Sequence, residues 1–174
     1  MGYRGAIIMS IFGTIFMMVA VGLLTTSHSA LLILPVLVLA AFLANLFRVR
    51  RSLSAIRQRT EQAGKVVMWS TIGEGVGIPV AINVVKNFGH PEWVLPAIAL
   101  VVGLHFIPMA FAIPFKAFYA LGAVLVAGSI IGMMLPQPIG AALSGLIAGA
   151  GLWVASVLAT RRELNWASAA QSTG

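Results

Sequence analysis

Long apolar runs separated by short polar gaps dominate the pattern of this chain. A helix needs about 20 residues to cross about 30 Å of hydrocarbon, and six runs are close to this length. They cover residues 5–24, 30–47, 66–85, 93–113, 117–135 and 139–160. None alternates apolar and polar residues as a barrel strand does, and a spanning segment must satisfy its own backbone hydrogen bonds. The pattern predicts an all-α polytopic membrane protein, in which residues 1–174 form one bundle of six transmembrane helices.

The composition agrees with a bilayer as the natural solvent. Hydrophobic residues make up 60% of the chain and charged residues 9%, whereas a soluble domain carries about 25% charged residues. There is too little polar surface to cover a globule in water. Cysteine is absent, which excludes disulfides and thiolate metal sites.

The positive charges indicate how the chain is oriented in the membrane. The loop 48–65, "RVRRSLSAIRQRTEQAGK", holds five arginines and a lysine, so the positive-inside rule makes it cytoplasmic. Alternation then places ten of the 11 basic residues inside and only Lys86 outside, with both termini cytoplasmic. Because the charges of this +7 chain fill the gaps between apolar runs, we expect no nucleic-acid partner.

Two segments allow a second interpretation. The basic loop could lie on anionic lipid as a short amphipathic helix, or remain a solvated topology signal. Its lipid contacts would be Arg50, Arg51, Arg57 and Arg59. The first apolar run could be a signal peptide that ends near "SHSA", although it is longer than a typical signal core.

One carboxylate stands inside an apolar run. The stretch "WSTIGEGVGIPVAIN" places Glu74, one of only four acidic residues, about 12 Å from the inner end of its helix. Ser70 and Thr71 precede it by four and three residues, so the three should share one helix face. A charge at this depth is costly, and the residue is expected to face protein or water. The stretch therefore predicts a proton or solute site.

The residues around Glu74 weaken a helix. Glycine lets backbones approach closely, and proline removes a backbone donor. We expect a broken helix at Gly73, Gly75, Gly77 and Pro79. In the alternative interpretation, Gly73 and Gly77 form a packing face and the acid is a buried structural group.

A histidine lies at the same expected depth on the next helix. In "VVGLHFIPMAF", His105 is about 12 Å from the inner end, and Pro108 opens the helix one turn later. If the two helices face each other, Glu74 and His105 form a carboxylate–imidazole pair that shares a proton. The alternative is a histidine that bonds a carbonyl freed by Pro108.

Other chemistry is poorly supported by the residues. Zinc needs three or four ligands, and His28, His90 and Glu92 are expected near the outer surface, so we expect no metal at Glu74. Enzyme motifs are missing and the chain has no aspartate. A nucleophilic Ser70 beside Glu74 and His105 is the one constellation left open for an enzyme. We expect a non-enzyme without a cofactor.

The last two runs are rich in small residues at four-residue spacing. Such spacing lets membrane helices pack closely. The glycines serve either packing within the chain or a homo-oligomer, and the candidate oligomer face is Gly128, Gly132, Gly145 and Gly149.

The stretch "GLHFIPMAF" (103–111) resembles one found in small uncharacterised bacterial integral membrane proteins, where G-L-H-F, an apolar residue and proline recur in a late span. The resemblance covers under a tenth of the chain. It implies a six-span protein of the bacterial cytoplasmic membrane, implies no activity, and points to His105.

The residues favour a small proton- or cation-linked solute binding or transport protein. In this hypothesis Glu74 accepts the proton, His105 is its partner or relay, and the hydroxyls of Ser70 and Thr71 bind water or solute. The rival hypothesis is a structural or accessory protein whose Glu–His pair fixes helix register.

Overall fold

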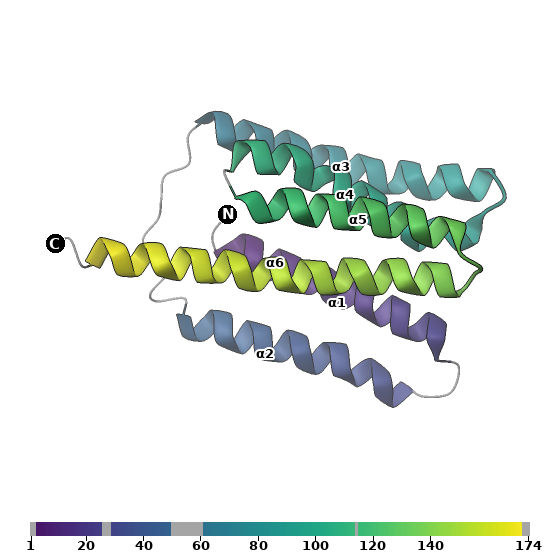
Figure 1. The fold of residues 1–174 in the computed structure, drawn as a ribbon, viewed down its shortest axis with the longest axis horizontal. Coiled ribbons are helices and arrows are strands. Elements are labelled where there is room, and N and C mark those ends of the chain that lie inside the picture. The colour runs from purple at the N-terminus through teal and green to yellow at the C-terminus, as the bar shows by residue number, and fades with distance from the viewer. Residues whose placement is uncertain (1–2, 26–28, 50–60, 114, 172–174) are drawn as a thin grey trace.

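The computed structural model describes residues 3–25, 29–49, 61–113 and 115–171 (Figure 1). Within these ranges the chain is helical and contains no strand. The elements are α1 (Tyr3–Leu24), η1 (Ser29–Leu32), α2 (Ile33–Val49), α3 (Glu61–Asn87), η2 (Pro91–Trp93), α4 (Val94–Ala112), α5 (Lys116–Met134) and α6 (Ile139–Gln171). The six α-helices are long and apolar enough to cross a membrane. The all-α prediction with six candidate spans is confirmed.

The helix ends depart from the apolar runs at two places. Helix α3 begins at Glu61 rather than near Val66, and α6 continues to Gln171 rather than ending near Thr160. Both extensions are polar and contain good helix formers such as Glu, Gln, Ala and Arg. Hydropathy marks the part of a helix that suits hydrocarbon, whereas the backbone continues wherever local propensity allows. Part of the predicted loop 48–65 is therefore the first turn of α3.

The order of the helices in space differs from their order in the chain. Helix α6 packs against α1, α5 and α4, and α4 packs against both α5 and α3. Helices α2 and α3 lie at opposite edges of the molecule (Figure 1). Helix α2 packs mainly on α1, and α3 packs mainly on α4. The two edge helices therefore each have one principal neighbour, and most of their surface faces outward.

The buried core lies between α1, α4, α5 and α6. Its fully buried large side chains include Met109 of α4, Phe118 and Leu125 of α5, and Leu152 of α6. Lipid is as apolar as these side chains, so burial in a bilayer gains little from the hydrophobic effect. Close packing must hold the helices together instead, and small residues permit it.

Glycines lie at the closest helix contacts. A Cβ added at Gly103 would stand 2.9 Å from Cβ of Leu125 and 3.0 Å from the backbone nitrogen of Val126. On the facing helix, a Cβ at Gly122 would stand 2.9 Å from the carbonyl oxygen of Gly103. Helices α4 and α5 approach here to a separation that leaves no room for a side chain.

The four glycines that the sequence offered as an oligomer face are buried inside the chain. A Cβ added to any of them would collide with a neighbouring helix of the same chain. The Cβ of Gly128 would meet Ile147, that of Gly132 would meet Ser144, that of Gly145 would meet Ala20, and that of Gly149 would meet the carbonyl of Gly13. Their role in this fold is to bring α5, α6, α1 and α4 together. In this fold the chain's own helices occupy the face that the sequence offered to a homo-oligomer.

Candidate functional site

The site lies where α3 packs on α4. Helix α3 continues without interruption through Gly73, Gly75, Gly77 and Pro79, and α4 continues through Pro108. The expected helix break is not seen, although each proline removes one backbone hydrogen bond. The amide of Asn83 donates to the carbonyl of Pro79 at 2.8 Å.

Only one of the three glycines touches α4. A Cβ added at Gly77 would stand 3.0 Å from Cγ1 of Val101, so the missing side chain lets α4 approach. Nothing lies within 4 Å of a Cβ added at Gly73 or Gly75. The alternative Gly73–Gly77 packing face is therefore half right: Gly77 packs and Gly73 faces outward.

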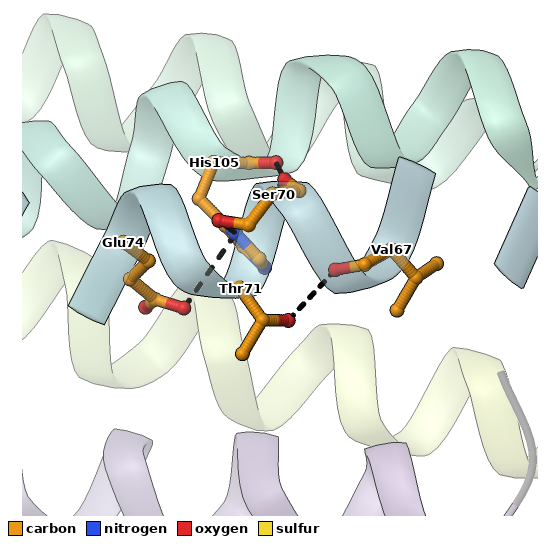
Figure 2. Close-up of polar contacts among 5 residues, drawn as sticks. All are labelled: Val67, Ser70, Thr71, Glu74 and His105. Carbon is orange, nitrogen blue, oxygen red and sulfur yellow. Dashed lines mark hydrogen bonds and ion pairs between the residues drawn. The ribbon is translucent and has the colours of Figure 1, made fainter. Parts of the chain in front are cut away.

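Ser70 and His105 join the two helices. The Ser70 hydroxyl donates to the carbonyl oxygen of His105 at 3.1 Å. Nδ1 of His105 lies 3.0 Å from Oγ of Ser70 and 3.0 Å from its carbonyl oxygen. Figure 2 shows the imidazole beside Ser70 at this crossing.

The carboxylate of Glu74 reaches the same nitrogen. Its Oε2 lies 3.6 Å from Nδ1 of His105, and the side chains are 18% and 8% exposed, respectively (Figure 2). This separation is within ion-pair range but longer than a direct hydrogen bond. Residue spacing along two antiparallel helices predicted that Glu74 and His105 lie at the same depth. In the structure the two side chains contact each other.

The contacts at Nδ1 determine where the ring hydrogen lies. A carbonyl oxygen can only accept, so the contact with the Ser70 carbonyl requires a hydrogen on Nδ1. The Ser70 hydroxyl already donates its one hydrogen to the His105 carbonyl and is left to accept from the ring. A neutral ring that donates to the Ser70 carbonyl carries its hydrogen on Nδ1, which leaves a lone pair on Nε2.

Oε2 of Glu74 is within ion-pair range of Nδ1. Two further polar atoms of this pair, Nε2 of His105 and Oε1 of Glu74, have neither a hydrogen-bond nor an ion-pair partner in the described part of the chain. No fully buried side-chain nitrogen or oxygen there lacks a partner. Both atoms must therefore reach the surface of the chain. We call them the free edge of the Glu74–His105 pair.

Thr71 does not join this site. Its side chain is exposed, and its hydroxyl donates to the carbonyl of Val67 at 2.9 Å, one turn earlier on its own helix. Figure 2 shows that bond, with no dashed line from Thr71 to His105 or Glu74. The predicted stripe of three residues is corrected to Ser70 and Glu74, because Thr71 does not lie on the side of α3 that faces α4.

Among the described residues, no group of three or more His, Cys, Asp or Glu side chains could hold a metal ion. His90 and Glu92 are joined by a 2.9 Å contact, and the His90 ring stacks on Trp93 with centroids 4.0 Å apart. His28 and the arginines named for lipid contact, Arg50, Arg51, Arg57 and Arg59, lie outside the described residues.

A second polar cluster, between α1 and α6, escaped the sequence interpretation. Oγ of Ser10 and Oγ of Ser156 lie 2.8 Å apart, and the Ser156 hydroxyl donates to the Ala6 carbonyl at 2.9 Å. Thr14 and Thr160 follow these serines by four residues and donate back to their carbonyls. That matching spacing on two apolar helices was a visible signal. Because its hydroxyls form hydrogen bonds within α1 and α6 and between them, the cluster serves to pack these two helices together.

The comparisons with known proteins give no family assignment. No protein-family model, no curated protein and no solved structure matches this chain. The chemistry of the chain must be inferred from its own residues.

Proposed function

We propose that this chain is a small membrane protein that binds a proton or cation at Glu74 and His105 and couples it to the movement of a solute. The observation that carries the proposal is the 3.6 Å contact between Oε2 of Glu74 and Nδ1 of His105 within two candidate membrane-spanning helices. Ionisable groups inside such helices are costly and mark ion or proton paths. Glu74 is the proton acceptor, His105 its partner, and Ser70 holds the ring in place.

The proposal includes a location and a topology. The basic residues favour six spans with both termini in the cytoplasm. The GLHFIP stretch resembles bacterial six-span proteins, which favours the bacterial cytoplasmic membrane with the bilayer as partner. Helix α3 belongs at the edge of the bundle, where a site can open without disturbing the core.

The arrangement of the three polar residues argues against a hydrolytic enzyme. In a catalytic triad the nucleophile bonds one ring nitrogen and the carboxylate bonds the other, so the imidazole can pass a proton. Here Ser70 and Glu74 both approach Nδ1. Such an arrangement cannot draw a proton from the serine while the carboxylate stabilises the opposite nitrogen.

A structural role is the second candidate, and the three Ser70–His105 hydrogen bonds favour it. They would fix the register of α3 on α4 whether or not a proton moves. Bulky variants at Gly145 or Gly149 cannot test this role through a partner, because both glycines pack inside the chain.

Proton movement in vesicles tests the proposal. We expect purified protein in proteoliposomes to carry a proton flux driven by a pH gradient, read with an internal pH dye. Glu74→Gln keeps the size of the side chain but cannot bind a proton, so its flux should fall to that of empty vesicles. Thr71→Ala, which lies next to the site but outside it, should retain the flux. Full flux in Glu74→Gln would contradict the proposal and favour the structural role.

A further inference from the structure

The free edge of the Glu74–His105 pair has a definite hydrogen-bonding character. With the hydrogen on Nδ1, Nε2 can only accept. An ionised Glu74 has only acceptors as well. Nδ1 and Oε2 lie 3.6 Å apart, and Nε2 and Oε1 belong to the same small ring and carboxyl group, so the two free acceptors lie at the same crossing of α3 and α4.

From this geometry we infer that the free edge binds a small cation carrying at least two N–H donors, such as a guanidinium or a protonated amine, and exchanges it for a proton. This inference rests on the proposed function and names its substrate class and direction of coupling. One N–H donates to Oε1 of Glu74, and a second donates to Nε2 of His105. A permanently charged cation without N–H groups lacks the donors that these two atoms need.

Charge makes the exchange one for one. With a neutral ring and an ionised carboxylate, the pair carries one negative charge, which one bound cation neutralises. A proton also neutralises the pair: on Glu74 it makes a neutral acid, and relayed to Nε2 it makes an imidazolium that pairs with the carboxylate across the 3.6 Å contact. The lone pair on Nε2 cannot bind a proton and accept an N–H together. Proton and cation therefore exclude each other.

Glu74 is the titratable side chain that contacts His105. Other titratable groups on elements that pack against α4 lie toward the ends of their apolar segments, and in the described residues these are Lys65, Lys86, Glu92, Lys116, Tyr119, Arg161, Arg162 and Glu163. The charge of Glu74 therefore has the main influence on whether a proton or the cation binds at Nε2.

The experiment compares two cations in proteoliposomes at one pH. Guanidinium has N–H donors and stays charged throughout, whereas tetramethylammonium is a charged cation without them. Vesicles loaded with either cation are diluted into cation-free buffer, and internal pH is followed with a dye. We expect guanidinium-loaded vesicles to take up protons as the cation leaves, at a rate at least tenfold above tetramethylammonium-loaded vesicles. His105→Phe, which keeps a ring but has no nitrogen, should abolish the difference.

The outcomes separate this inference from the proposed function. Equal rates with both cations, proton efflux alongside guanidinium, or full exchange in His105→Phe would each overturn the inference. If gradient-driven proton flux still depends on Glu74 in those cases, the proposed function stands without it. To exclude a folding failure as the cause of lost exchange, His105→Phe must elute from gel filtration and unfold as the unmodified protein does. If it does not, guanidinium competition against proton uptake by the unmodified protein decides, and an absence of competition overturns the inference.

Discussion

Adjacent hydroxyls on α3 have different partners. Ser70 donates across to the His105 carbonyl at 3.1 Å, whereas Thr71 donates back along its own helix to Val67 at 2.9 Å. A single-residue step around the helix axis decides whether a hydroxyl joins α3 to α4 or stays on the outer surface. The two residues therefore form a matched pair for testing what holds the edge helix.

We expect Ser70→Ala to loosen α3 and Thr71→Ala to leave it unchanged. Ser70→Ala removes two interhelical contacts, each worth about 0.6 kcal/mol in membrane proteins. Thr71→Ala removes a bond within one helix and replaces threonine with a better helix former. Hydrogen exchange of the α3 amides in detergent measures the difference, and equal exchange in both variants would contradict it.

The sequence was sufficient to place Glu74 and His105 at the same depth, but not to say whether they face each other or to choose between Ser70 and Thr71. Depth along two antiparallel helices follows from a fixed rise per residue. Facing direction depends on how each helix is rotated about its axis, which packing with neighbours sets. Both hydroxyls lie within one turn of Glu74, so helical spacing alone could not exclude Thr71.

At the scale of the helices, two glycines inside candidate membrane-spanning helices have opposite environments. Gly103 is buried in the contact between α4 and α5, whereas Gly73 has open space where a side chain would be. Four-residue spacing correctly indicated that α5 and α6 pack closely. It could not say that the neighbour is another helix of the same chain, since a second copy would use the same spacing.

We expect Gly103→Ala to destabilise the protein by about 1–3 kcal/mol, the usual cost of overpacking. The added Cβ would stand 3.0 Å from the backbone nitrogen of Val126, which cannot rotate away as a side chain can. Gly73→Ala is the control, and its stability should be unchanged or slightly increased, because alanine favours the helix. Unfolding in mixed detergent gives both values. Equal destabilisation of the two variants would contradict the packing of α4 on α5.

At the scale of the whole molecule, consecutive helices α2 and α3 are separated by the rest of the bundle (Figure 1). Six apolar runs could be read from the sequence because hydrocarbon imposes a minimum length on each. The arrangement of the runs around α6 could not, since it depends on contacts between residues far apart in the chain. The fold class could therefore be predicted from the sequence, whereas the choice of which helices pack against one another could not.

Six crossings predict that the α3–α4 connection and the end of α6 face opposite sides of the membrane. The chain has no cysteine, so single cysteines report accessibility without background. We expect an impermeant thiol reagent added outside cells to label Asn87→Cys and not Ser168→Cys, and the reverse in inverted vesicles. Ser144→Cys, at a buried position, should react only after denaturation. Labelling of Asn87→Cys and Ser168→Cys from the same side would contradict six crossings.

The most direct test of the free edge is nitrogen NMR of protein with ¹⁵N-labelled histidine rings. The chain has three histidines, and the signals that vanish in His105→Gln identify the ring at the site. We expect the neutral ring to carry its hydrogen on Nδ1 at high pH, and Nε2 to gain a hydrogen as the pH falls. A neutral ring with its hydrogen on Nε2 would contradict the free edge, and an Nε2 signal that does not change with pH would contradict proton binding at His105.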